Sequence, residues 1–315
     1  MGDLTLMSSA FENPCEGDII ILNDSSLWIV KGCFHPIGYI IAVPRIINGR
    51  KVKKLKDMYK IITRYYTHFL RYIPELGLKA PLVPRKFVRT FYHALSTKSV
   101  KGLNKLHDIC RELLDIIEGS CNTECGITGS LLGGYYIDSS DIDLICLDRP
   151  KLYDCLLKLR SEGVLLPLTE EVFSSELIEV SEGLDTKTHL KLITHKVLQG
   201  IYKGYRYTLR IINCSRLNNY LGPYDYVLRV PKAILKVVTT DYRTPSIFIV
   251  DIIKLPLGEY TIRNRGKSLC ISHRLRYTEI PVGALMMVSN ALIMIKRNVV
   301  IFNLDFSDHV IVIIP

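Results

Sequence analysis

The sequence contains no apolar run of the length that a membrane-spanning helix needs, about 20 predominantly apolar residues. It also lacks internal repeats and low-complexity tracts, and its composition, 48% hydrophobic and 23% charged, is that of an ordinary globular protein. The first 13 residues include two acids and no base, unlike a secretory signal peptide. We therefore expect a globular protein of the cytoplasm, without a membrane partner.

Regular cysteine spacing is absent as well. The nine cysteines are an odd number, and we expect them to be reduced, as in a cytoplasmic protein. The one close pair, Cys121 and Cys125, has neither a second pair nor a neighbouring histidine, so it does not predict a zinc site.

Acidic residues are scarce in one part of the chain. Between Arg45 and Lys105 there are sixteen Lys or Arg and only two acids, a local charge of +14 in a chain whose total is +10. Such asymmetry favours a polyanionic partner, and we predict nucleic-acid contacts from Arg50, Lys51, Lys53, Lys54 and Lys56. The alternative is an amphipathic helix with core aromatics and solvated charges, which explains the tyrosines of residues 59–66 better but not the missing acids.

The chemistry is predicted at residues 126–144. Gly129 and Ser130 open a short helix, and Asp141 and Asp143 alternate with apolar residues as on one face of a strand. Two carboxylates on one face can share a Mg²⁺ ion, which prefers oxygen ligands. Gly129 allows the backbone to approach a phosphate, and the Ser130 hydroxyl and the helix N-terminus can donate to it. The alternative is a turn and a strand that ends in two solvated aspartates.

This arrangement resembles the signature of the DNA polymerase beta-like nucleotidyltransferase superfamily over about residues 100–215. More loosely, the chain resembles uncharacterised archaeal proteins predicted to be nucleotidyltransferases, through residues 16–19 (EGDI) and 35–38 (HPIG). The resemblance implies catalytic, metal-binding Asp141 and Asp143, nucleotide contacts from Gly129 and Ser130, Mg²⁺ or Mn²⁺ as cofactor, and a nucleoside triphosphate as substrate.

The family commonly carries a third carboxylate on a later strand, but the predicted strand over residues 205–213 contains no acid. Arg210 stands there instead, and it either contacts the triphosphate or pairs with an acid. A third ligand could come from Asp148, Glu179 or Asp251; otherwise catalysis is weak or lost.

The resemblance and the strand and helix patterns together predict an α+β fold with four segments. These are a small N-terminal β module (1–48), a basic helical connector (49–100), a central polymerase beta-like nucleotidyltransferase domain (101–222) and a C-terminal all-β barrel or sandwich (223–315). Helices are expected over 85–94, 102–119, 150–162, 169–182 and 187–199.

The predicted function is Mg²⁺-dependent transfer of a nucleoside monophosphate from a triphosphate to a hydroxyl, with RNA or DNA as an acceptor. The alternative is a catalytically impaired protein that binds nucleic acid. A third, weaker hypothesis is a protein that holds a complex together.

Overall fold

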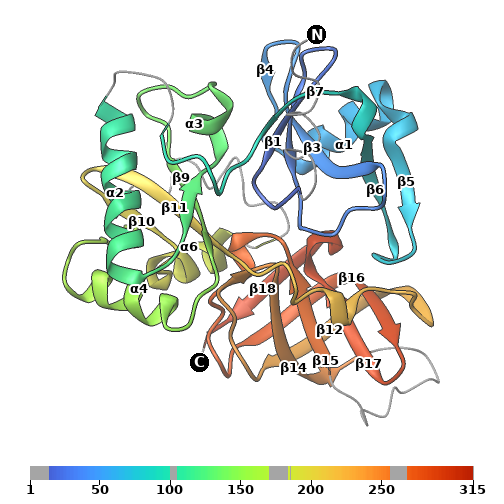
Figure 1. The fold of residues 1–315 in the computed structure, drawn as a ribbon. Coiled ribbons are helices and arrows are strands. Elements are labelled where there is room, and N and C mark those ends of the chain that lie inside the picture. The colour runs from blue at the N-terminus through green and yellow to red at the C-terminus, as the bar shows by residue number, and fades with distance from the viewer. Residues whose placement is uncertain (1–13, 100–104, 170–183, 185, 256–267, 315) are drawn as a thin grey trace. The chain divides into compact units, whose positions relative to one another are not determined.

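The computed structural model describes residues 14–99, 105–169, 184, 186–255 and 268–314 (Figure 1). The chain divides into two compact units. The first contains residues 1–71, 79–166 and 198–214, and the second contains residues 72–78, 167–197 and 215–315. The four segments predicted from the sequence remain a prediction.

A seven-stranded sheet, of which all but the end of β5 and the first residue of β6 belongs to the first unit, has the order β5-β6-β3-β2-β1-β7, with β4 paired to β3. Its strands are β1 (Ile19–Leu22), β2 (Leu27–Val30), β3 (Tyr39–Ile47), β4 (Arg50–Lys51), β5 (Leu70–Ile73), β6 (Leu78–Pro84) and β7 (Val88–Tyr92). The pairs β1–β2 and β2–β3 are antiparallel. Strands β5, β6 and β7 join the same sheet, so it extends beyond the residues 1–48 expected to form an N-terminal β module.

Trp28, the only tryptophan, is fully buried in the core of this sheet. Its indole Nε1–H donates to Ser26 Oγ at 2.8 Å, and its ring lies edge-on to Tyr66 at 5.1 Å. Tyr66 follows helix α1 (Leu55–Tyr65), and Phe69 packs in the same core. Tyr66 and Phe69, which follow the helix, therefore contribute to this core, while Tyr59 and Tyr65 on the helix itself are exposed.

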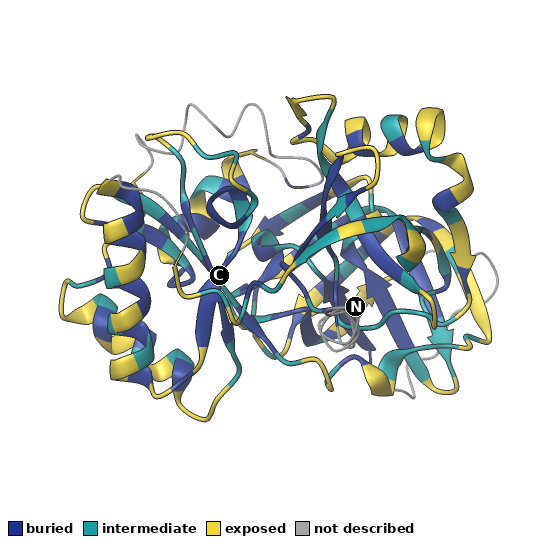
Figure 2. Ribbon diagram, turned by 45° about the horizontal axis from the view of Figure 1, so that its top comes forward, coloured by how far each residue is buried: buried dark blue, intermediate teal, exposed yellow. Residues whose placement is uncertain are grey.

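A second sheet in the first unit has the strand order β10-β11-β9-β8. It contains β8 (Cys125–Ile127), β9 (Ile142–Leu147), β10 (Gln199–Tyr202) and β11 (Tyr205–Ile212), with helices α2 (Lys105–Cys121), α3 (Gly129–Gly133) and α4 (Leu152–Ser161). Strand β9 is antiparallel to β8 and parallel to β11. One side of α2 is apolar and buried and the other is exposed, as the long helices of Figure 2 show.

The two sheets of the first unit meet through close backbone approaches. Gly126 of β8 lies against residues 94 and 95: a Cβ placed on it would be 2.0 Å from the Ala94 carbonyl oxygen and 2.5 Å from that of Leu95. One residue past β8, the Thr128 hydroxyl donates to the Gly17 carbonyl at 2.5 Å. These contacts attach the N-terminal sheet to the turn that carries the predicted chemistry.

The second unit is built on β12 (Tyr226–Val237), β14 (Ser246–Lys254), β15 (Ser268–Ser272), β16 (Leu285–Lys296), β17 (Val299–Asn303) and β18 (His309–Ile313). Because β12 pairs with both β14 and β16, five of these strands close into a barrel. Helix α6 (Thr186–His195) belongs to this unit, and Leu192 on it joins the barrel's hydrophobic core.

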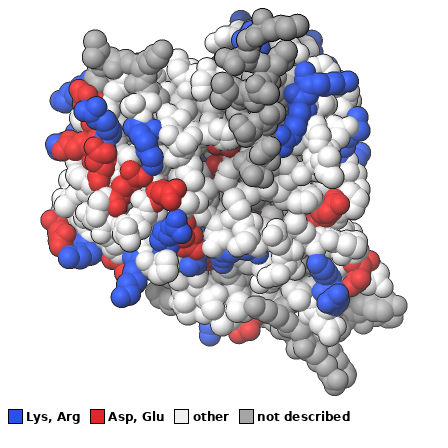
Figure 3. Space-filling model, viewed as in Figure 1, with Lys and Arg blue, Asp and Glu red and all other residues white. Residues whose placement is uncertain are grey.

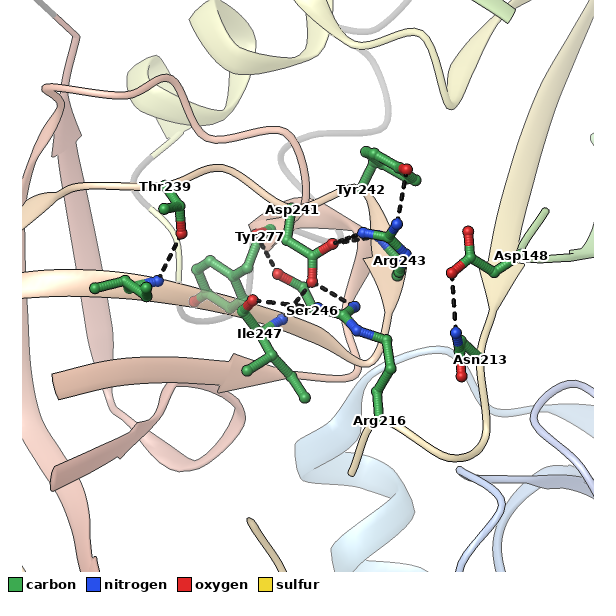
Figure 4. A network of polar contacts seen from close by, with 11 residues as sticks. Asp148, Asn213, Arg216, Thr239, Asp241, Tyr242, Arg243, Ser246, Ile247 and Tyr277 are labelled. Carbon is green, nitrogen blue, oxygen red and sulfur yellow. Dashed lines mark hydrogen bonds and ion pairs between the residues drawn. The ribbon is translucent and has the colours of Figure 1, made fainter. Parts of the chain in front are cut away.

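A buried carboxylate organises one end of this unit (Figure 4). Asp241, 2% exposed, accepts hydrogen bonds from Arg216 Nη1 at 2.7 Å, from Arg243 Nη1 at 3.2 Å and from the Ile247 N–H at 2.7 Å. The two guanidinium groups and the amide offset the cost of burying its charge. We interpret this network as a structural one.

The expected α+β fold around a polymerase beta-like core is wrong. The structure is mostly β, with 40% strand and 25% helix, and only five α-helices occur among the described residues. Much of the difference lies in residues 49–100, which were predicted to be a helical connector. Among the described residues of this segment α1 is the only α-helix, and β4, β5, β6 and β7 are strands. The stretch 85–94, expected as a helix, forms a 3-10 turn and then β7, whose β-branched and aromatic residues pair with β1.

Several sequence-based expectations have other outcomes. The helix expected over 169–182 and Glu179 fall outside the described residues, Thr169 excepted. The nine cysteines, expected to be reduced, include six joined as Cys33–Cys214, Cys121–Cys155 and Cys125–Cys146. Among the described residues, no helix has the length and apolar character to span a membrane.

The close approach at Gly126 can be tested by adding one methyl group. We expect Gly126→Ala to lower the free energy of unfolding by about 3 kcal/mol or more, because the methyl group meets backbone oxygens that cannot move aside independently. The control is Gly119→Ala in α2, where no atom lies within 4 Å of the added carbon; it should leave stability unchanged or raise it by up to ~1 kcal/mol. Equal losses in urea denaturation would contradict this packing.

Candidate functional site

The two halves of the predicted motif lie side by side in the first unit. The Thr128 N–H donates to the Asp143 carbonyl at 3.0 Å, which continues the β8–β9 ladder by one residue. Gly129 then turns with φ +66°, and a Cβ on it would lie 2.0 Å from Asp143 Oδ2. The carboxylate of Asp143 therefore occupies the space that any other residue at position 129 would need.

Asp141 and Asp143 interact with each other and with different partners. Asp141 is half-buried and accepts a hydrogen bond on Oδ1 from Arg206 Nε of β11 at 2.9 Å. Removal of its carboxyl from water, and then the charge of Asp141, raise the pKa of Asp143 to about 6. Such interaction between their charges is expected of two carboxylates on one side of a strand.

Three cationic groups lower the pKa of Asp143 and so oppose the effects of burial and of Asp141. Arg210, Arg45 and Lys51 each lower its pKa, so their positive charges lie close enough to attract the carboxylate. They come from β11, β3 and β4 respectively. The site therefore combines two carboxylates with at least three cations, drawn from both sheets of the unit.

Arg210 also pairs with an acid that the sequence analysis did not select. Its Nη1 lies 3.8 Å from Glu16 Oε1, and Glu16 is 1% exposed. Glu16 further accepts from Lys31 Nζ at 3.0 Å and from the Gly32 N–H at 2.6 Å. Arg210 thus pairs with an acid, as the second alternative expected, and it also attracts Asp143; its contact with a triphosphate stays a prediction. The sequence signals for Glu16 were its place shortly before an apolar strand and the EGDI match over residues 16–19.

Of the three candidates for a third carboxylate, only Asp148 is described within the first unit, and it is distant from Asp143 along the chain. Asp148 lies five residues beyond Asp143 on an extended strand, about 16 Å away, and accepts from Asn213 Nδ2 at 3.0 Å (Figure 4). Asp251 is on β14 of the second unit, and Glu179 is outside the described residues.

Ser130 is buried in the first turn of α3, directly after Gly129.

The predicted nucleic-acid contacts are all exposed. Arg50 and Lys51 form β4, Lys53 and Lys54 follow it, and Lys56 is in the first turn of α1. Lys51 differs from the others, because its Nζ lies 5.4 Å from the Tyr135 ring centroid and its charge acts on Asp143.

By contrast, acidic and basic side chains are interspersed over α2 and α4 (Figure 3), where Lys203 pairs with Glu112. Exposed positive charge in the first unit begins at β4 and the start of α1 and continues through α1 to β7, on Lys60, Arg64, Arg71, Lys79, Lys86 and Arg89.

The comparisons with known proteins add no relative. No family model, curated protein or solved structure matches the chain. The function of the site must therefore be argued from its own geometry.

The raised pKa of Asp143 predicts a pH-dependent effect of Asp143→Asn. The folded protein holds this proton up to about pH 6, whereas an unfolded chain releases it near the ordinary value of 3.8. Wild-type stability therefore falls as the pH rises through that window. We expect the variant to match wild type below the window and to exceed it by ~1–3 kcal/mol at pH 8. Denaturation curves at several pH values measure this.

The control for this measurement is Asp138→Asn in the exposed loop after α3, which should change stability by less than about 0.5 kcal/mol at any pH. A variant Asp143→Asn that is less stable than wild type at pH 8 would contradict the cost assigned to the buried charge.

The contact between Gly129 and Asp143 has a matched control in Gly134. Both glycines have left-handed φ angles, +66° and +69°, but nothing lies within 4 Å of a Cβ on Gly134. Alanine at either position should cost ~1–2 kcal/mol of backbone strain. Only Gly129→Ala should also displace the Asp143 carboxylate and change its titration midpoint, measured by carboxyl-carbon NMR. An unchanged midpoint would mean that the two groups are not in contact.

Proposed function

We propose that this protein is a Mg²⁺-dependent nucleotidyltransferase that transfers a nucleoside monophosphate from a triphosphate to a hydroxyl group of RNA or DNA. The observation that carries the proposal is the contact between Gly129 and the Asp143 carboxylate. It brings the bare backbone that can approach a phosphate to the carboxylate that can bind the metal.

The donor set fits a divalent cation that prefers oxygen. Asp141 and Asp143 supply two neighbouring carboxylates, and raising the pKa of Asp143 to about 6 still leaves it ionised near neutral pH. Bound Mg²⁺, or Mn²⁺, would neutralise charge on the triphosphate and complete its coordination with phosphate oxygens and water. Asp141 would then exchange or share its contact with Arg206.

The cations around Asp143 support binding of the triphosphate. Arg45, Lys51 and Arg210 bring positive charge to the same carboxylate. Guanidinium groups bind phosphate oxygens in pairs, and an ammonium group adds a point charge. Ser130, in the first turn of α3, can add a hydroxyl donor.

In the proposed reaction the acceptor hydroxyl oxygen bonds to the α-phosphorus. The bond from that phosphorus to the bridging oxygen of the β-phosphate breaks, pyrophosphate leaves, and the hydroxyl proton passes to water. The residues contribute mainly by positioning the two reactants and by stabilising negative charge on the leaving group. This function does not require the polymerase beta-like fold, because a site of this kind can be built on different folds.

The exposed lysines and Arg50 near β4 support a nucleic acid as the acceptor. They lie on the strand and helix start that also bring Lys51 to Asp143, so a backbone bound there would lead towards the carboxylates. A nucleoside triphosphate, Mg²⁺ and nucleic acid are all available in the cytoplasm, which we propose as the compartment.

The second candidate is a protein that binds nucleic acid without catalysis. The ion pair between Asp141 and Arg206 favours it, because that carboxylate already has a charged partner at 2.9 Å. The absence of an acid on β11 favours it as well.

The proposal predicts transfer of label from an α-labelled, but not from a γ-labelled, nucleoside triphosphate to RNA or DNA in the presence of Mg²⁺ or Mn²⁺. Asp143→Asn should reduce the rate by about 100-fold or more, the equivalent of ~2.7 kcal/mol in the barrier. Asp138→Asn serves as the control and should keep the wild-type rate.

Three results would decide against nucleotidyl transfer. Transfer of the γ-label would indicate phosphoryl transfer, and transfer that survives in Asp143→Asn would come from a contaminant. If no nucleotide and no acceptor is labelled, but salt-dependent nucleic-acid binding persists with a chelator and in Asp143→Asn, the non-catalytic candidate is supported instead.

A further inference from the structure

Three sulfur atoms from distant parts of the chain meet in the first unit. Cys15 precedes β1, Cys33 follows β2, and Cys214 follows β11. Cys15 Sγ lies 3.2 Å from Cys33 Sγ and 3.3 Å from Cys214 Sγ, and the latter two are joined as a disulfide. We call these three residues the cysteine cluster.

The cluster differs from the other cysteines of the chain, all nine of which are described. The remaining disulfides are simple pairs, Cys121–Cys155 and Cys125–Cys146, and the other two free thiols, Cys110 and Cys270, are buried. Within the described ranges, this is the only group of three His, Cys, Asp or Glu whose ligand atoms come close enough to hold a metal ion. A disulfide needs two sulfurs, so it gives no role to the third.

Hydrogen bonds hold the cluster's backbone independently of the disulfide. The Cys15 N–H donates to Asp18 Oδ2 at 2.8 Å, and Asp18 Oδ1 accepts from the Ala94 N–H at 2.8 Å. His35 lies in the loop after Cys33, and its Nδ1 accepts a hydrogen bond from the Ile41 N–H at 3.1 Å. The ring proton is therefore on Nε2, which donates to the Pro14 carbonyl at 3.1 Å. The segments carrying Cys15 and Cys33 thus remain together when the disulfide is reduced.

The same contacts define the ligand set. His35 is two residues from Cys33, but both its ring nitrogens are engaged by backbone groups. The cluster therefore offers three sulfur ligands, and Cys214 among them is exposed, so one side of the site is open to solvent.

We propose that in the reduced protein Cys15, Cys33 and Cys214 bind a Zn²⁺ ion. Thiolates are preferred ligands of this cation, and three protein ligands leave one tetrahedral position for water or an external ligand. The Cys33–Cys214 bond takes two electrons and two protons from a thiol or phosphine reductant and becomes two thiols. Binding of Zn²⁺ then releases the three thiol protons to solvent.

A Zn²⁺ ion at this position would connect the segment before β1 to the end of β11. Glu16 directly follows Cys15 and pairs with Arg210 on β11. The ion would thus stabilise the contact between the two sheets of the first unit. The inference does not depend on nucleotidyl transfer, because it rests on different residues.

The test uses the full chain, reduced with a phosphine, freed of metal by a chelator and then titrated with Zn²⁺ against a chromophoric competitor. We expect one ion per chain, with Co²⁺ giving the sulfur-to-metal charge-transfer absorption of thiolate ligands. Cys15→Ser should weaken binding by more than about 100-fold, since even the outer partners of metal ligands contribute ~10–100-fold. The control Cys110→Ala should keep one ion per chain.

A second measurement covers the case in which Cys15→Ser does not fold. In the reduced wild type, Zn²⁺ should protect Cys15, Cys33 and Cys214 from alkylation, as read by mass spectrometry, and a chelator should abolish the protection. The proposal is overturned if the reduced wild type takes up no Zn²⁺ or if alkylation of the three residues is independent of Zn²⁺. Undiminished binding by folded Cys15→Ser would equally overturn it.

Discussion

The close contact between the Gly129 backbone and the Asp143 carboxylate is the constraint on which the candidate site depends. It exists because β8 and β9 are antiparallel neighbours and because the chain turns with positive φ directly after β8. A side chain at position 129 would occupy the place of the carboxylate. The turn after β8 and the acid-bearing strand β9 therefore form one structural feature, whatever reaction they serve.

The cost of holding Asp143 away from water is only partly offset by charges from elsewhere in the unit. Arg210, Arg45 and Lys51 attract the carboxylate, yet its pKa still lies near 6, so burial and the neighbouring Asp141 outweigh them. Arg210 is oriented in turn by the buried Glu16, which also binds Lys31. A ligand that brought positive charge to the carboxylates and negative charge to the cations would relieve both imbalances. This is the electrostatic reason to expect a metal–phosphate ligand there.

Much of the local structure near the site could be predicted from the sequence. The short helix predicted at Gly129 and Ser130 and the strand predicted to carry Asp143 both occur. Their signals were local: apolar alternation, glycines at the turn, and serines before the aspartates. The stretch 85–94 failed because its amphipathic pattern suits a helix, whereas pairing with β1 makes its centre a strand. Such pairing joins residues about 70 positions apart, which no local pattern reports.

The sequence by itself determined the positions of the glycine turn and the acidic strand, because φ preferences and apolar periodicity act within a few residues. The tertiary structure alone decided the mostly β architecture, the placement of Glu16 and Arg45 at the site, and the meeting of Cys15, Cys33 and Cys214. Each of these depends on which strands pair and which segments pack together. Those choices are made by the free energy of the whole core, to which many distant residues contribute.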